Sequence, residues 1–263
     1  MKSVFAILSR TAIAAFMATA FALATAPVSA EEMPYDHMHL RMADPAAGAA
    51  WYAEHMGGEL QTGSPAVKYK QTIVRFFGGE DVGTSHNAVI DHIGFSFANL
   101  EEKVAELEAA GVKVTMPVRE IPNLFKIAFV EDPWGGRIEL AEDLEWGEGF
   151  HHIHLRDTDP EAMLAWLHDS FGGDRKKLGG LLDVIDQGGV LMAAMKSEAP
   201  TEPSDNHVFD HLGYATKDIE KAMAELSAKG SKQVGEIRAM GPVKFGFVEG
   251  PSGVLVEIVQ WPN

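Results

Sequence analysis

The stretch HMHLRMADP, residues 37–45, occurs a second time as HIHLRDTDP, residues 152–160. Both copies alternate histidine with apolar residues and end in Asp-Pro. In a β-strand, residues i and i+2 share a face, so the two histidines and the arginine of each copy point one way and the apolar residues the other. The Asp then suits a helix N-cap and the Pro the first helical position. The stretch therefore predicts a strand with one polar face, followed directly by a helix.

A second pair of segments is also duplicated. DHIGFSFANLEEKVAELEAAG begins at Asp91, and DHLGYATKDIEKAMAELSAKG begins at Asp210. Each reads as a strand followed by an amphipathic helix, which Gly111 or Gly230 ends in the manner of a C-terminal glycine. Alternating apolar segments separated by turn residues follow each helix. The sequence thus predicts an α+β protein of four βαβββ modules, over residues 35–85, 88–142, 150–198 and 208–260.

The first thirty residues have the composition of a cleaved secretory signal. A basic start precedes an apolar run that ends in small residues at Val28 and Ala30. The alternative is an uncleaved membrane anchor, for which the apolar run is short. We expect residues 1–30 to be a signal peptide and the mature chain to be periplasmic or extracellular, without stable membrane insertion. The chain has no cysteine, which is compatible with an oxidising compartment.

The net charge of -16 limits the possible partners. A surface this acidic repels phosphate backbones, so no nucleic-acid partner is expected. The simplest interpretation is a solvated acidic surface that aids solubility.

Histidine and glutamate recur at matching places in the four modules. A Glu flanked by Ile, Leu and Val is costly to bury unless a positive group meets it. Two neutral imidazoles and a carboxylate suit a divalent metal and leave coordination positions open, as in non-haem iron(II) sites. Any single histidine could instead be a hydrogen-bonded or surface side chain. The candidate metal ligands are His37, His92, Glu139, His152, His211 and Glu257.

The segments HMHLRMADP, DHIGFSF and VEDPWGGRIEL resemble the vicinal oxygen chelate (VOC) superfamily, which includes glyoxalase I, type I extradiol dioxygenases, epimerases and fosfomycin and bleomycin resistance proteins. The resemblance implies two tandem glyoxalase-like domains, residues 31–145 and 146–263, each a half-open barrel of two neighbouring modules around a metal. It assigns His37, His92 and Glu139 to the first domain and His152, His211 and Glu257 to the second. The ion would be Fe2+, Mn2+, Zn2+ or Ni2+, in one domain or in both.

The sequence departs from both well-known branches of that superfamily. Glyoxalase I and the epimerases take a fourth ligand from the last strand of the first module, where this chain has Arg75, and Met192 or Ala193 in the second half. The extradiol dioxygenases carry a Tyr and an acid-base His near the metal. At the tyrosine position this chain has Phe129 in the first half and Phe247 in the second. The histidine position lies near Phe77 or Lys196. A three-ligand set is thus present without the ring-cleavage residues.

Four further polar residues share the face of the ligand strands. Arg41 and Arg156 are candidates for binding a carboxylate or phosphate of a substrate, the alternative being an ion pair with a surface acid. His39 and His154 are candidate catalytic residues that move a proton or hydrogen-bond the ligands, the alternative being polar filling of the barrel.

Three functions remain open from the sequence. The first is a metal-dependent lyase or isomerase in which a divalent ion acts as Lewis acid on a small oxygenated molecule. The second is an extradiol-type iron(II) dioxygenase, and the third is a metal-free binding or resistance protein. A monomer and a homodimer are both compatible with the four-module layout.

Overall fold

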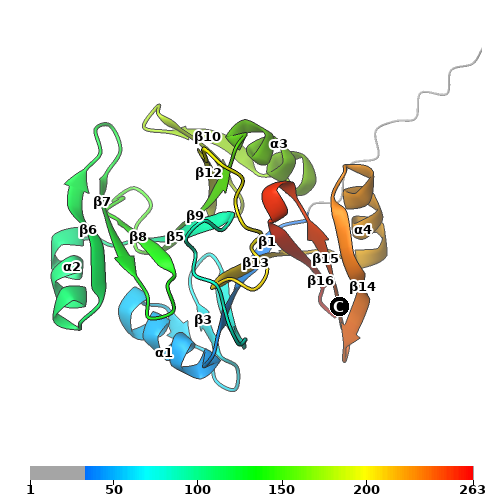
Figure 1. Cartoon of the computed structure of the whole chain (residues 1–263), viewed down its shortest axis with the longest axis horizontal. Helices are drawn as coiled ribbons and strands as arrows, with labels where there is room; N and C mark the ends of the chain where they lie inside the picture. The colour runs from blue at the N-terminus through cyan, green and yellow to red at the C-terminus, as the bar shows by residue number, and fades with distance from the viewer. Residues whose placement is uncertain (1–32, 263) are drawn as a thin grey trace, which may run out of the picture. The chain divides into compact units, whose positions relative to one another are not determined.

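The computed structural model describes residues 33–262, which belong to one compact unit. The prediction of four βαβββ modules in an α+β fold is confirmed (Figure 1). Module 1 comprises β1 (Tyr35–Met42), α1 (Pro45–Met56), β2 (Glu59–Leu60), β3 (Ala66–Lys68) and β4 (Ile73–Gly78). Module 2 comprises β5 (Ile90–Ser96), α2 (Leu100–Ala109), β6 (Lys113–Glu120), β7 (Lys126–Glu131) and β8 (Arg137–Ala141).

The second half of the chain repeats this order. Module 3 comprises β9 (Gly149–Asp157), α3 (Pro160–Phe171), β10 (Asp174–Leu178), β11 (Leu182–Asp186) and β12 (Leu191–Lys196). Module 4 comprises β13 (Phe209–Ala215), α4 (Ile219–Ala228), β14 (Lys232–Met240), β15 (Val243–Glu249), the short 3-10 helix η1 (Pro251–Gly253) and β16 (Leu255–Gln260). Residues 1–30, the predicted signal peptide, lie outside the described residues.

The helix ends follow the local sequence signals. Asp44 accepts hydrogen bonds from two backbone amides of the first turn of α1, and Asp159 accepts one at the start of α3. Gly111 and Gly230 follow α2 and α4 with φ of +82° and +92°, a conformation that favours glycine. These residues stop each helix where the chain must turn back into the sheet.

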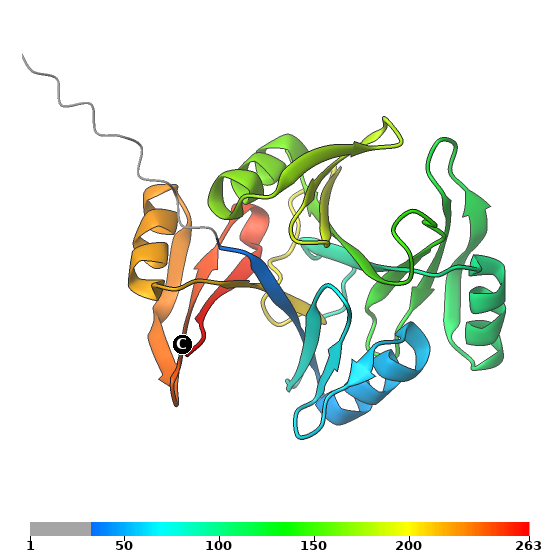
Figure 2. The same cartoon turned by 180° about the vertical axis from the view of Figure 1, so that it is seen from behind.

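The modules pair across the two halves of the chain. One eight-stranded sheet has the order β14-β15-β16-β13-β1-β4-β3-β2 and joins module 1 to module 4. The other has the order β10-β11-β12-β9-β5-β8-β7-β6 and joins module 2 to module 3 (Figure 2). The expectation that neighbouring modules share a barrel is therefore wrong. The antiparallel strand pairs that join two modules into one sheet are β1 with β13 and β5 with β9.

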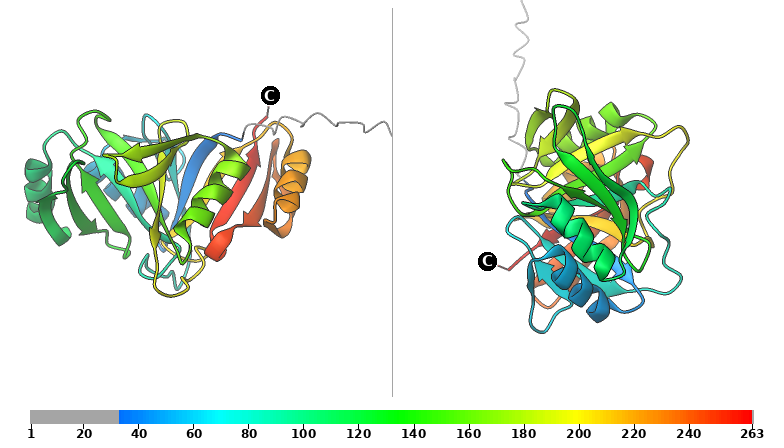
Figure 3. Two further views of the ribbon diagram at one scale, coloured as in Figure 1. Left: turned by 90° about the horizontal axis from the view of Figure 1, so that it is seen from above. Right: turned by 90° about the vertical axis from the view of Figure 1, so that its left-hand side faces the viewer.

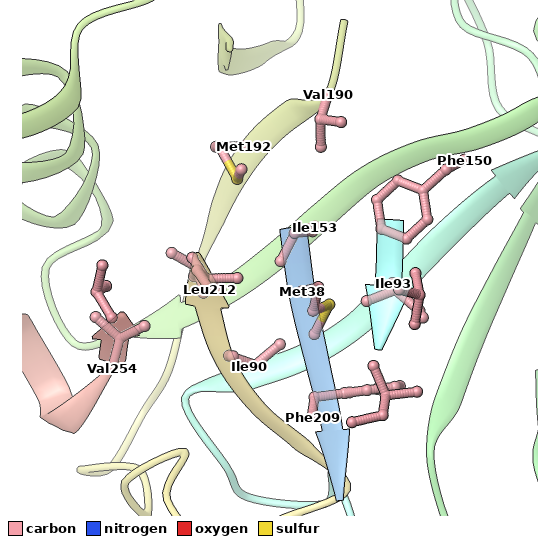
Figure 4. Close-up of a cluster of buried hydrophobic side chains, with 14 of the residues drawn as sticks. Met38, Ile90, Ile93, Phe150, Ile153, Val190, Met192, Phe209, Leu212 and Val254 are labelled. Carbon is pink, nitrogen blue, oxygen red and sulfur yellow. The ribbon is translucent and has the colours of Figure 1, made fainter. Parts of the chain in front are cut away.

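A shared core lies between the two sheets. Met38 and Leu212 of one sheet and Ile93 and Ile153 of the other are fully buried in one cluster (Figure 4). These are the apolar positions that alternate with the polar face of β1, β5, β9 and β13. Each helix packs on strands of its own module, and α2 and α4 lie at opposite ends of the unit (Figure 3). The histidine faces consequently point away from this core.

Within residues 33–262, no helix has the length and apolar character needed to span a bilayer.

Candidate metal centres

Two clusters of possible ligand atoms lie on the polar faces of the two sheets. In each cluster, four ligand atoms lie within 4.8 Å of one another. The β1 group consists of His37, His39, His211 and Glu257. The β9 group consists of His92, Glu139, His152 and His154. All six ligands predicted from the sequence thus belong to one group or the other, together with the two histidines predicted as catalytic candidates.

The structure corrects the prediction of which ligands belong to the same group. His37 lies with His211 and Glu257, and His152 lies with His92 and Glu139. The sets implied by the resemblance, which kept each half of the chain to itself, are wrong. The cause is the sheet pairing, because β1 lies beside β13 and β9 lies beside β5.

The β1 group is arranged around the carboxylate of Glu257. Its Oε2 lies 2.8 Å from Nε2 of His37 and 3.6 Å from Nε2 of His211. The ring of His39 lies 4.4 Å from that of His211 and 4.7 Å from that of His37, centroid to centroid. Three imidazoles from two strands therefore surround one carboxylate.

The β9 group repeats the arrangement with a looser carboxylate contact. Oε2 of Glu139 lies 3.2 Å from Nε2 of His92 and 3.8 Å from Nε2 of His152. Nδ1 of His154 lies 3.2 Å from Nε2 of His92. Both carboxylates are 9% exposed, so they are held among the imidazoles rather than in solvent.

Unsatisfied nitrogen atoms show that these donors fit a metal ion. Among the described residues, Nε2 of His152, of His154 and of His211 is buried without a hydrogen-bond partner. Buried polar atoms are rarely left in this state. Imidazole nitrogens together with a carboxylate oxygen suit zinc, iron(II) and nickel(II). A divalent ion would use the free lone pairs and offset the charge of the buried glutamate.

Aspartates hold the far side of the ligand rings. Nδ1 of His37 lies 2.7 Å from Asp36, and Nδ1 of His211 lies 2.5 Å from Asp210. Such carboxylates fix the tautomer and orientation of a metal-bound imidazole. The β9 group has the equivalent pair in Asp91 and His92, at 2.6 Å.

In the β9 group, Nδ1 of His152 lies next to a histidine and not next to an aspartate. His151, fully buried, stands where the β1 group has Asp36, and its Nδ1 lies 2.7 Å from Nδ1 of His152. Its other nitrogen lies 3.3 Å from Asp143. The sequence shows His151 directly before the ligand, but nothing in the alternating pattern marked it as part of the site.

The arginines predicted to bind substrate contact these aspartates. Nε of Arg41 donates to Asp210 at 2.7 Å, and the guanidinium of Arg156 donates to Asp91. Arg137 also donates to Asp91, at 2.8 Å. Both predicted arginines therefore support the aspartate behind a ligand histidine, and a substrate contact by either remains a prediction.

The pKa shifts separate two kinds of histidine. Burial lowers the pKa of His211, but the nearby carboxylates of Asp210 and Glu257 outweigh it and raise the pKa. His92 is raised in the same way by Asp91 and Glu139. By contrast, burial and then the charges of neighbouring imidazoles lower the pKa of His39 to about 2.

The pKa of His154 also falls well below its usual value, first because of burial and then because of His92. A neutral imidazole with so low a pKa is a weak proton acceptor but keeps a lone pair for a metal. Both histidines can therefore offer a lone pair to an ion as fourth ligands, and their catalytic role remains a prediction.

Two glycines allow the first histidine of each group to lie on the neighbouring strand. A Cβ on Gly213 would come within 2.3 Å of the His37 ring, and a Cβ on Gly94 within 2.1 Å of the His152 ring. Real Cβ contacts are not this short, so both positions require glycine. The repeated signal was present in DHIG and DHLG, but its meaning depends on which strands pair.

The positions at which the sequence departs from glyoxalase I and the extradiol dioxygenases lie next to the two groups, and one of these positions differs between the groups. Arg75 lies beside His39 in the register of β1 with β4, and Ala193 lies beside His154 in that of β9 with β12. Phe247 pairs with Glu257, and its ring packs edge-on against His211. Phe129 takes the same place beside Glu139 and His92 in the β9 group.

The pockets over the groups differ in size. A pocket of about 380 Å3 over the β1 group is lined by Arg75, Phe77 and Trp261, among others. The pocket over the β9 group is about 190 Å3, and its walls are mostly leucine, isoleucine, valine and phenylalanine. The donor sets are alike, but the space available to a ligand is not.

Two segments, residues 35–140 and 149–258, match the sequence profile of the Glyoxalase/Bleomycin resistance protein/Dioxygenase superfamily. Glyoxalase I from Zea mays is similar in structure, with a TM-score of 0.71 and 16% identity over 88% of this chain and 93% of that one. A Bacillus subtilis subsp. subtilis strain 168 protein, provisionally named a dioxygenase, has a TM-score of 0.64 and 14% identity over 89% and 86%. At these identities the likeness concerns the fold. No protein of curated function matches by sequence. The two profile matches span most of the sequence, and the chain belongs to the Glyoxalase/Bleomycin resistance protein/Dioxygenase superfamily.

Proposed function

We propose that this protein is an exported metal-dependent enzyme that acts on a small oxygenated organic molecule as a lyase or isomerase. The observation that carries the proposal is the convergence of three imidazoles and one buried glutamate, with imidazole nitrogens left unsatisfied, in each of two groups. A divalent ion bound there supplies a Lewis acid that stabilises negative charge on a substrate oxygen. The export part of the proposal rests on the composition of residues 1–30.

The chain's own residues supply the remaining requirements. Asp210 and Asp36 fix the orientation of His211 and His37. Phe77 and Phe247 cover the sides of the β1 group and exclude water from it. Exclusion of water strengthens the electrostatic stabilisation of charge that develops during a reaction.

The residues at the acid-base positions of a ring-cleaving dioxygenase favour lyase or isomerase chemistry over ring cleavage. Phe247 and Phe129 lie beside the glutamates, where a tyrosine would serve a ring-cleaving dioxygenase, and a phenyl ring cannot move a proton. Lys196 is exposed and donates to the backbone carbonyl of Thr158. The extradiol dioxygenase is accordingly the second candidate.

The first test is the metal content of the purified chain. We expect about two ions per chain in the wild type and about one after either Glu257→Gln or Glu139→Gln, because each substitution removes the anionic donor of one group. His168→Ala is the matched control, since the side chain of that histidine is 42% exposed and its ring lies beside its neighbour Asp169. A wild-type chain that takes up no zinc, iron, manganese or nickel would contradict metal dependence.

The second test concerns the reaction class. The metal-loaded chain should catalyse exchange of the α-protons of hydroxyacetone in D2O, followed by NMR, because this exchange passes through negative charge on a carbonyl oxygen. Glu257→Gln should reduce that exchange, and Glu257→Gln combined with Glu139→Gln should abolish it, because each group then lacks its carboxylate. Oxygen consumption with catechol, in the absence of proton exchange, would instead favour the dioxygenase.

A further inference from the structure

The pocket over the β1 group contains a cation that the metal ligands do not explain. Arg75 on β4 lies beside His39 of β1 in the parallel register, and it lines the 380 Å3 pocket together with His37, His211 and Glu257. At the corresponding position in the β9 group, beside His154, stands Ala193. Only the β1 group therefore has a positive charge next to the candidate ligands at this strand position.

Within residues 33–262, the guanidinium of Arg75 has no carboxylate partner. Its Nε atom is buried and donates no hydrogen bond to the described residues, and no ion pair joins the guanidinium to an acid. Arg41, Arg137 and Arg156 all bind an aspartate behind a ligand histidine. In a chain with 38 acidic and 22 basic residues, an arginine without an acid is well placed to bind an anion from outside.

The surroundings of Arg75 define what that anion looks like. Its guanidinium lies 5.6 Å from the centroid of the Trp261 ring, which stabilises the cation but leaves its hydrogen-bond donors available. Phe77, Phe247 and Val259 form apolar walls of the same pocket. The pocket thus combines one cation with a surface that favours an aromatic or branched aliphatic group.

Arg75 and His39 lie on neighbouring strands and line the same pocket. Neighbouring strands lie about 4.8 Å apart, so Arg75 and the imidazole of His39 face the pocket side by side. A ligand whose anionic group is close to the oxygen that faces the imidazoles can contact both side chains. A 2-oxo or 2-hydroxy carboxylate has this arrangement, and Arg binds carboxylates with two parallel hydrogen bonds.

We propose that the β1 group takes a 2-oxo or 2-hydroxy carboxylic acid with an aryl-sized apolar substituent, and that Arg75 binds its carboxylate. The β9 group, with Ala193 and a smaller apolar pocket, does not take this acid. The assignment rests on the proposed function, because the oxygens of the acid face the same imidazoles and glutamate. It makes Arg75 the residue that sets specificity for anionic substrates.

The test is calorimetric titration of the zinc-loaded full chain with phenylglyoxylate. We expect one acid bound per chain although two ions are present, and a weakening of about tenfold or more in Arg75→Gln. Arg175→Gln is the matched control, because this exposed arginine pairs with Glu161 on another part of the surface. Phenylglyoxamide, which has no negative charge, should bind more weakly than phenylglyoxylate and equally to wild type and Arg75→Gln.

Metal analysis of the same samples separates this proposal from the proposed function. Binding that depends on Arg75, in a chain that takes up no metal, would support the anion site and contradict the metal-dependent enzyme. Equal affinity of wild type and Arg75→Gln in metal-loaded chains would overturn the proposal and leave the metal site intact. Two acids per chain, or no binding of phenylglyoxylate at millimolar concentration, would also overturn it.

Discussion

Gly213 is the residue on which the position of His37 depends most directly. The His37 ring lies against the backbone of Gly213, in space that a Cβ would occupy. Gly213→Ala should displace that ring and reduce the metal content by about one ion per chain, because the β1 group would lose a donor while the β9 group is unchanged. Elemental analysis after gel filtration measures this loss.

Gly246→Ala on β15 is the control for the generic effect of alanine in a strand. A Cβ at Gly246 would meet its nearest neighbour, Met223, at 3.4 Å, an ordinary contact. This variant should retain the wild-type metal content. If Gly213→Ala also retained both ions with full occupancy, the ring would not need the space above the glycine, and the proposed placement of His37 as a ligand would be contradicted.

At the scale of elements, the turn between β7 and β8 is fastened to α1 by one buried acid. Asp132 accepts hydrogen bonds from Tyr52 at 2.7 Å and from the backbone amides of Gly136 and Trp134. Burial raises the pKa of Asp132 to about 6 in spite of these bonds. The equivalent turn of module 4 has Gly250 at this position, so only one of the two turns carries the acid.

This turn predicts a specific pH dependence of stability. The folded state binds the Asp132 proton more tightly than the unfolded state, whose pKa is near 3.8. The stabilisation is therefore present below about pH 4 and is lost as pH rises through about 6, by roughly 2–3 kcal/mol. Urea unfolding with a chelator present should show this decrease in the wild type and not in Asp132→Asn. The exposed Asp174→Asn should follow the wild type, and a wild-type decrease retained in Asp132→Asn would contradict the assignment.

At the scale of the whole molecule, the sequence defines the modules better than it defines their partners. The alternation around His37 and His152, the helix caps and the glutamates among apolar residues are local patterns, and each predicted a strand, a helix end or a buried polar residue that the structure contains. The choice between β5 and β13 as the neighbour of β1 is not local. All four modules present the same polar and apolar faces, so the pattern fits either pairing, and only the packing of the shared core distinguishes them. The roles of Gly213 and Gly94 depend on that choice, so the sequence alone does not reveal them.

Pairs of substitutions can test the module pairing in solution. In the structure, His37 and His211 belong to one group, whereas His37 and His92 belong to different groups. Removing His37 and His211 together should therefore lower the metal content by about one ion per chain, and removing His37 and His92 together by about two, since each group loses its ion when a donor is missing. If modules paired with their sequence neighbours, the order would reverse, with the second double variant keeping one ion and the first losing both. Circular dichroism of each double variant would show whether the sheets remain folded, and elemental analysis of folded protein then identifies which strands lie side by side.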